Sequence, residues 1–159
     1  MVINILFTLI LSWILFSISK EDIKTMLISE NKLRIFAISG IIYIVTLGLL
    51  YKSINTIDLI TDNISAMLIV FLIMYLISSI SYILFKVNSL GIGDIKLASI
   101  SSIWLGIEFT FLSLSISFLL SAIYSIYGKI TMRFQSFHQY PFAPFLSIGI
   151  FCSWILDKI

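Results

Sequence analysis

Six long apolar runs constrain this chain more than any other feature. They cover residues 2–19, 33–51, 64–85, 94–107, 109–127 and 142–156. A helix needs about 20 mostly apolar residues to cross the hydrocarbon core of a membrane, whereas a membrane β-strand needs about 9–11. With 60% hydrophobic and 11% charged residues, the chain also has too little polar surface to coat a water-soluble core. The sequence therefore predicts an all-α integral membrane protein, a bundle of about six transmembrane helices that forms one domain over residues 1–159.

The first apolar run and the single cysteine narrow this class further. No basic segment precedes the first run and no A-x-A site follows it, so we expect a membrane helix rather than a removed signal peptide. Cys152 lies in an apolar run near the end of the chain. A lone cysteine excludes an intramolecular disulfide and a cysteine-based zinc site. We expect Cys152 to be a small buried hydrophobic side chain.

Basic residues gather on one side of the predicted membrane. If the runs cross in alternate directions, three connections share that side and hold eight of the ten basic residues: Lys20, Lys24, Lys32, Arg34, Lys86, Lys96, Lys129 and Arg133. Because cytoplasmic loops are enriched in Lys and Arg, we expect this side to face the cytoplasm and both termini to lie outside. The net charge is only +2, so no nucleic-acid partner is expected.

Serines recur every four residues in the fifth apolar run, at Ser113, Ser117, Ser121 and Ser125. Residues at this spacing share one face of a helix. Small residues on such a face let neighbouring membrane helices approach closely. We therefore interpret the stripe as a packing surface rather than as a chemical site.

Two aspartates return to the same membrane face. Asp22 follows the first apolar run and Asp94 begins the fourth, and two crossings separate them. On a helix, Asp94 shares its face with Ala98, Ser101 and Ser102, a small and weakly polar surface that suits the interior of a bundle. Gly91 and Gly93 remove side chains at the turn before this helix, which lets another chain approach the carboxylate.

Two carboxylates held close in a poorly solvated site cannot both ionise easily, so such a pair shares a proton. The ionised member can take a proton from water while the neutral member polarises a scissile carbonyl. Spacing alone leaves an alternative open. The two aspartates could instead mark helix ends or balance the charges of Lys24 and Lys96.

Three motifs resemble one known family. Residues 91–97, GIGDIKL, resemble the GxGDxKL motif of type IV prepilin peptidases, a branch of the GxGD membrane aspartyl proteases. Asp22 with Ile28 is similar to the family's first catalytic region, Asp followed after five residues by Ile-Pro-Asn, with Ser29 and Glu30 in place of Pro-Asn. Residues 141–145, PFAPF, resemble the PFGP-like segment before the last helix. The three motifs stand in the family's order and cover nearly the whole chain.

The resemblance implies an aspartic-type endopeptidase of the plasma membrane that serves type IV pilus assembly or protein secretion. Its catalytic pair would be Asp22 and Asp94, with the active site shaped by Gly91, Gly93, Lys96, Pro141 and Pro144. Its substrates would be prepilins or pilin-like proteins, cleaved at the cytoplasmic face after a short basic leader. No cofactor or metal is implied.

Several features limit what the resemblance transfers. The paired CxxC motifs linked to methylation in many members are absent, so we expect a minimal form without methyltransferase activity. Lys96 lies at offset 2 from Asp94, off the catalytic face, and His138 lacks metal-ligand partners. Two alternatives remain: a signal-peptide-peptidase or presenilin-like GxGD protease, and a non-enzymatic membrane transport or assembly component.

Overall fold

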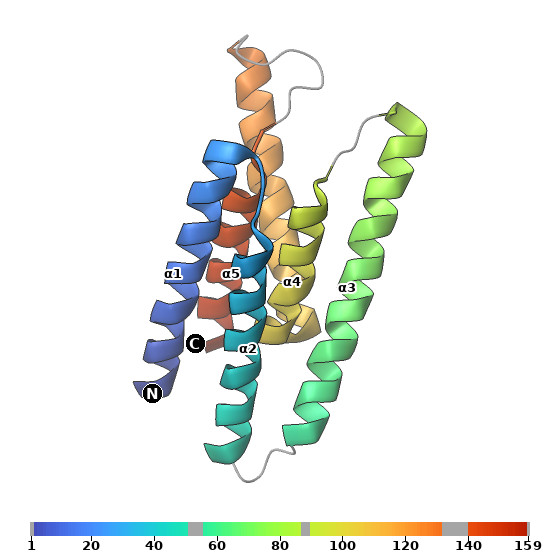
Figure 1. The fold of residues 1–159 in the computed structure, drawn as a ribbon. Coiled ribbons are helices and arrows are strands. Elements are labelled where there is room, and N and C mark those ends of the chain that lie inside the picture. The colour runs from blue at the N-terminus through green and yellow to red at the C-terminus, as the bar shows by residue number, and fades with distance from the viewer. Residues whose placement is uncertain (1, 51–55, 87–89, 132–139, 159) are drawn as a thin grey trace.

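A computed structural model describes residues 2–50, 56–86, 90–131 and 140–158 of the chain. Within these ranges the secondary structure is entirely helical (Figure 1). The helices are α1 (Val2–Thr25), α2 (Glu30–Leu50), α3 (Thr56–Phe85), α4 (Ile92–Ile130) and α5 (Ala143–Lys158). The predicted all-α bundle is therefore confirmed.

The helix α4 consists of two arms that run in opposite directions (Figure 1). Between residues 92–105 and residues 107–130, the backbone of Gly106 has φ 69° and ψ −179°. This combination is open essentially to glycine alone. The two arms correspond to the predicted runs 94–107 and 109–127, so the described part of the chain contains six helical segments in five elements.

Side chains from two helices satisfy the backbone at this reversal. A broken helix leaves carbonyl groups without helical partners, which is costly where no water is present. Asn63 of α3 donates its Nδ2 to the Ile103 carbonyl at 3.1 Å, and Thr110 donates its hydroxyl to the Gly106 carbonyl at 2.6 Å. The reversal is thus built into the packing of α3 against α4.

Among the described residues, four helices are long and apolar enough to cross a membrane: α1, α2, α3 and α4. Both chain termini lie toward one end of the bundle, and the turn from α1 into α2 lies at the other end, with the start of α4 (Figure 1). The helix ends that border the three connections predicted to be rich in basic residues therefore lie at one end of the bundle (Figure 1). Lys129 lies in the last turn of α4 at this end, whereas Arg133 lies outside the described residues.

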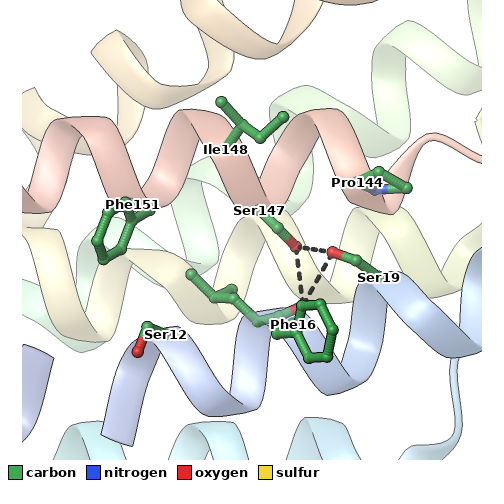
Figure 2. A pocket seen from close by; sticks show the side chains of 8 residues that line it. Ser12, Phe16, Ser19, Pro144, Ser147, Ile148 and Phe151 are labelled. Atoms are coloured by element: carbon green, nitrogen blue, oxygen red, sulfur yellow. Dashed lines mark hydrogen bonds between the residues drawn. The ribbon is translucent and has the colours of Figure 1, made fainter. Parts of the chain in front are cut away.

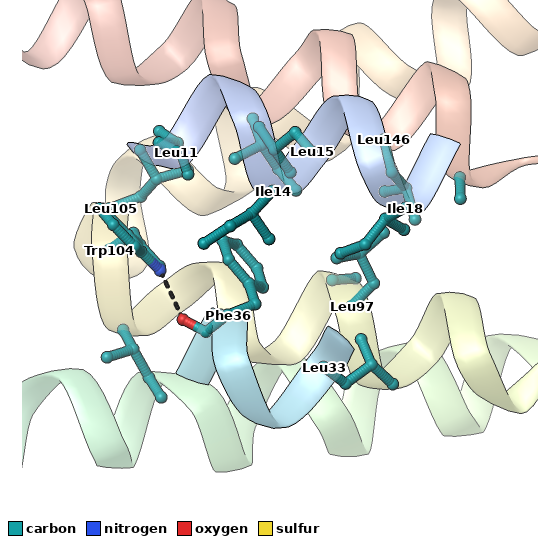
Figure 3. Packing of buried hydrophobic residues seen from close by; sticks show 14 of the residues in the cluster. Leu11, Ile14, Leu15, Ile18, Leu33, Phe36, Leu97, Trp104, Leu105 and Leu146 are labelled. Carbon is teal, nitrogen blue, oxygen red and sulfur yellow. Dashed lines mark hydrogen bonds between the residues drawn. The ribbon is translucent and has the colours of Figure 1, made fainter. Parts of the chain in front are cut away.

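Aromatic side chains form the centre of the core, near the middle of α2. Trp104 of α4 is 2% exposed, stacks on Phe36 and Tyr43 of α2, and meets Trp154 of α5 edge-on. Its indole N–H donates to the Phe36 carbonyl at 3.0 Å (Figure 3). A Cβ on Gly40 would lie 2.7 Å from the indole nitrogen, so glycine provides the space for this ring.

The serine stripe is a packing surface, as predicted, and the structure places α5 against it. Ser113 and Ser117 are fully buried, Ser121 is 8% exposed, and a Cβ on Gly149 of α5 would lie closer than 3.0 Å to the first two. The prediction for Cys152 is wrong, because its side chain is exposed on the outer face of α5. An apolar residue on that face meets lipid instead of the core, so burial could not be inferred from hydrophobicity.

Candidate active site

Asp22 lies in the last turn of α1 and is 4% exposed. The sequence placed it after the first helix, but α1 continues through the charged residues to Thr25. The Asp22 Oδ2 accepts the N–H of Ala143, the first residue of α5, at 3.0 Å. The first N–H groups of a helix lack partners within that helix. Asp22 therefore holds the start of α5 against the end of α1.

Residues 141–145, PFAPF, form the approach to α5 and its first turn. Phe142 is 8% exposed, and its carbonyl accepts the N–H groups of Phe145 and Leu146 in the first turn of α5. Pro144 is the second residue of the helix, where a missing N–H costs nothing and the fixed φ is already helical. Pro141 is half-buried in the approach to this turn. The two prolines thus flank the N–H group that bonds to Asp22.

Asp94 is the third residue of α4, on a face whose other members are buried as predicted. Ala98, Ser101 and Ser102 are fully buried. The Asp94 carboxyl group bonds to the backbone of Gly91, the residue that caps this helix. Its second oxygen, Oδ1, is buried and has no hydrogen-bond partner among the described residues. Buried polar atoms in this state are uncommon in folded proteins and can mark a functional group.

Gly91 and Gly93 leave room for two different neighbours. Gly91 has φ −70° and ψ 148°, which any residue adopts, but a Cβ there would lie 3.2 Å from Asp94 Oδ2. A Cβ on Gly93 would lie 3.2 Å from the Cβ of Ile28, in the turn after α1. The second contact packs this turn onto the start of α4. It brings the end of α1, which carries Asp22, close to the start of α4, which carries Asp94.

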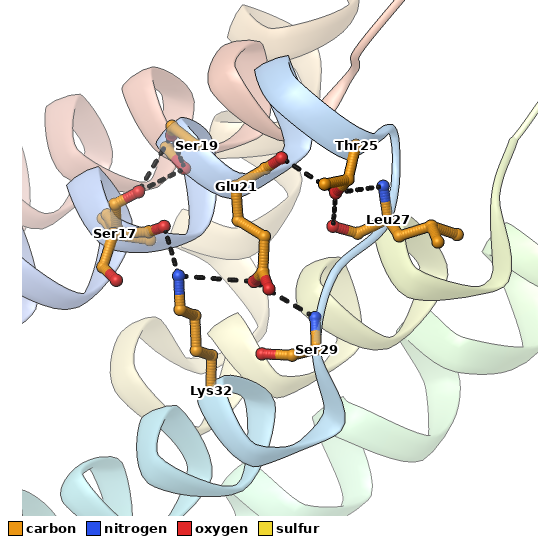
Figure 4. Close-up of polar contacts among 9 residues, drawn as sticks. Ser17, Ser19, Glu21, Thr25, Leu27, Ser29 and Lys32 are labelled. Carbon is orange, nitrogen blue, oxygen red and sulfur yellow. Dashed lines mark hydrogen bonds and ion pairs between the residues drawn. The ribbon is translucent and has the colours of Figure 1, made fainter.

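One ion pair and two hydrogen bonds brace the turn between α1 and α2. Lys32 of α2 pairs with Glu21 at 3.3 Å and donates to the Ser17 carbonyl of α1 at 2.7 Å (Figure 4). Glu21 also accepts the Ser29 N–H at 3.3 Å. This N–H exists because serine occupies the position where the prepilin-peptidase motif has proline. With serine in place of proline, the turn is therefore held by the hydrogen bond from Ser29 to Glu21.

Lys96 pairs with Glu30, the first residue of α2. Their side chains are 39% and 62% exposed, and the pair points away from the buried face of Asp94. Exposed ion pairs contribute little to stability. Lys96 is thus off the buried face, as its offset from Asp94 predicted, and it links α4 to α2 beside the two aspartates.

Some of the site was not predicted and some lies outside the described residues. No motif or spacing in the sequence predicted the hydrogen bond from the Ala143 N–H to Asp22 or the pairing of Lys96 with Glu30. His138 lies outside the described residues. Within the described ranges, no three His, Cys, Asp or Glu side chains converge as metal ligands.

These features define a helical membrane-type bundle with two carboxyl groups, from α1 and α4, gathered at one end. The chain belongs to the type IV leader peptidase family, since the model of that family matches residues 9–126. The matched range includes both Asp22 and Asp94 and ends before α5. Comparison with curated proteins and with solved structures gave no match. The resemblance based on motifs is therefore confirmed at the level of a family of membrane-embedded peptidases.

Proposed function

We propose that the chain is an aspartic endopeptidase that removes the basic leader of prepilins or pilin-like proteins. The observation that carries this proposal is the convergence of Asp22 and Asp94 at the same end of the bundle, with Asp94 Oδ1 buried and unpartnered among the described residues. In the prepilin-peptidase motif, these positions are the catalytic aspartates. The proposal treats residues 1–159 as one catalytic domain.

The proposed chemistry needs only water and the two carboxyl groups. The ionised carboxylate takes a proton from water as the water oxygen attacks the scissile carbonyl carbon. At the same time, the neutral carboxylic acid gives its proton to the carbonyl oxygen. The carboxyl group that took the proton from water then gives it to the amide nitrogen, the other carboxylate takes a proton from a hydroxyl group of the tetrahedral intermediate, and the carbon–nitrogen bond breaks. The products are the leader with a new carboxyl group and the mature protein with a new N-terminal amine, and the pair again shares one proton.

Supporting roles are proposed for the residues around the pair. Gly91 keeps space beside the Asp94 carboxyl group, and Gly93 allows Ile28 to close the turn after α1. Pro141 and Pro144 flank the backbone N–H that orients Asp22. Lys96 positions α4 against α2 through its ion pair with Glu30.

Co-expression with a type IV prepilin tests the function. We expect the membrane fraction to convert the precursor to a product shorter by the basic leader, with the cleavage position read by mass spectrometry. The parallel culture without the enzyme should keep the precursor intact. A precursor that keeps its full mass in the presence of stable, membrane-inserted enzyme would contradict the proposed substrate.

Cysteine labelling tests the proposed orientation, with the active site facing the cytoplasm. In a Cys152→Ala background, single cysteines are placed at the exposed positions Asn31, Lys129 and Asp58. We expect an impermeant thiol reagent to label position 58 in intact cells and positions 31 and 129 only after permeabilisation. Labelling of position 31 in intact cells would reverse the orientation and place the carboxyl pair outside.

A further inference from the structure

A groove with a volume of about 370 Å³ runs between α1 and α5 (Figure 2). Ser12, Phe16 and Ser19 of α1 face Ser147, Ile148 and Phe151 of α5. The groove is lined mainly by apolar side chains, and no other described helix lies among its lining residues. None of the residues that line it belongs to the carboxyl pair.

One end of the groove reaches the candidate active site. Ser19 precedes Asp22 by three residues, about one helical turn. At the same end, the lining residue Pro144 directly follows Ala143, whose N–H bonds to Asp22. Ser19 lies seven positions after Ser12, so the groove extends about 10 Å along α1. Its shape suits an elongated ligand that lies parallel to the helices and ends beside the carboxyl pair.

The lining also has the chemistry of a helix-packing surface in a membrane. Small serines form part of its floor, beside the larger Phe16 and Ile148, which are 66% and 49% exposed. Small residues let a second helix backbone approach closely where lipid removes the hydrophobic driving force. The alternation of small and large side chains gives a surface into which the ridge of another helix fits.

The hydroxyl groups of Ser19 and Ser147 lie at the end of the groove where the N-terminus of a substrate helix would lie. Ser19 donates to Ser147 across the groove at 2.8 Å, at the end nearest Asp22. The first N–H groups of a helix lack intrahelical acceptors and need them in an apolar environment. Serine oxygens can accept such N–H groups. A helix whose N-terminus lies here would place the preceding peptide bond toward the two aspartates.

We propose that this groove binds the apolar membrane helix of the protein substrate, with the N-terminal end of that helix beside Ser19 and Ser147. The inference rests on the proposed function, and it places the membrane helix of the substrate in the groove between α1 and α5. A lipid acyl chain or a second copy of this chain could occupy an apolar groove, but neither would deliver a scissile peptide bond to Asp22 and Asp94. The continuity between groove and carboxyl pair favours the substrate helix.

Filling the groove at Ser12 tests this proposal without touching the carboxyl pair. Ser115, an exposed serine on the second arm of α4, provides a control, because Ser12 and Ser115 each donate only to a carbonyl of their own helix. We expect Ser12→Phe to raise KM for a type IV prepilin about tenfold with little change in kcat, the signature of lost binding rather than lost catalysis. Ser115→Phe should leave both constants unchanged.

Photo-crosslinking separates failure of the groove from failure of the function. A photoreactive residue at position 12 of the Asp94→Asn protein should cross-link to tagged prepilin, and the same residue at position 115 should not. If wild-type protein cleaves the prepilin but Ser12→Phe keeps its KM and position 12 captures only lipid or a second copy, the groove proposal is overturned while the function stands. If wild type cleaves nothing, the proposed function fails, and capture of prepilin at position 12 alone would still support the groove.

Discussion

Asp22→Asn and Asp94→Asn should each abolish prepilin cleavage while leaving the protein at its normal level in the membrane. Asparagine keeps the shape and much of the hydrogen bonding of aspartate, including an oxygen that can accept the Ala143 N–H, but it cannot exchange a proton. If the two groups act as one unit, the double variant should be no worse than either single variant, because such residues are strongly non-additive. Cleavage is measured as the fraction of precursor converted, with the amount of enzyme read by immunoblot.

Two further variants sharpen this test. Asp94→Glu moves the carboxyl group by about an ångström, and misplacement of that order can cost on the order of 100-fold in rate. Lys96→Ala is the matched control at the same end of α4. It removes an exposed ion pair with Glu30 but no group on the buried face, so we expect a far smaller loss.

The alternative view of the aspartates predicts another pattern. An aspartate that only caps a helix costs about 1 kcal/mol when it is lost, which would leave an active enzyme in smaller amount. Stable Asp94→Asn protein that still processes prepilin would therefore exclude the two-aspartate mechanism. A loss for Lys96→Ala as severe as for Asp94→Asn would show that its charge takes part in the reaction.

The convergence of Asp22 and Asp94 could be expected from the sequence because it depends on counting membrane crossings. Two crossings return the chain to the same face whatever the details of side-chain packing. Burial of the face around Asp94 followed in the same way, from the helical spacing of Ala98, Ser101 and Ser102. Both features follow from the helical spacing of residues and the number of membrane crossings, and a single sequence is enough to infer these.

Other parts of the site depend on contacts between distant segments. The apolar pattern stops at Lys20, but α1 continues to Thr25, so hydrophobicity placed Asp22 just beyond a helix that in fact contains it. The hydrogen bond from Ala143 to Asp22 joins residues 121 positions apart and uses a backbone N–H, which leaves no mark on composition. Gly106 was one glycine among seven until its φ of 69° showed that it reverses the chain.

Gly149→Ala should destabilise the bundle and, with it, the candidate active site. A Cβ at this position would lie closer than 3.0 Å to the Ser117 hydroxyl and to the backbone carbonyl of Ser113. The carbonyl cannot rotate away, so α5 would have to move from α4. Overpacking of this kind typically costs about 1–3 kcal/mol. Alanine is about 1 kcal/mol better than glycine inside a helix, so a net loss of stability would come from the close contact.

Movement of α5 would also reach the carboxyl pair, because the first residue of α5 holds Asp22 through its N–H. We therefore expect Gly149→Ala to lower the thermal unfolding midpoint in detergent and to lose most of its prepilin cleavage per folded molecule. Cys152→Ala, at an exposed position less than one turn further along α5, should change neither quantity.

A double variant tests which of the two close contacts matters. Ser117→Gly removes the hydroxyl near position 149 but leaves the Ser113 carbonyl in place. Added to Gly149→Ala, it should therefore restore little stability or activity. Full recovery in the double variant would assign the effect to the hydroxyl, whereas a Gly149→Ala protein as stable and active as the parent would show that α5 does not lie this close to α4. Loss of cleavage with partial retention of stability would tie the position of α5 directly to the orientation of Asp22.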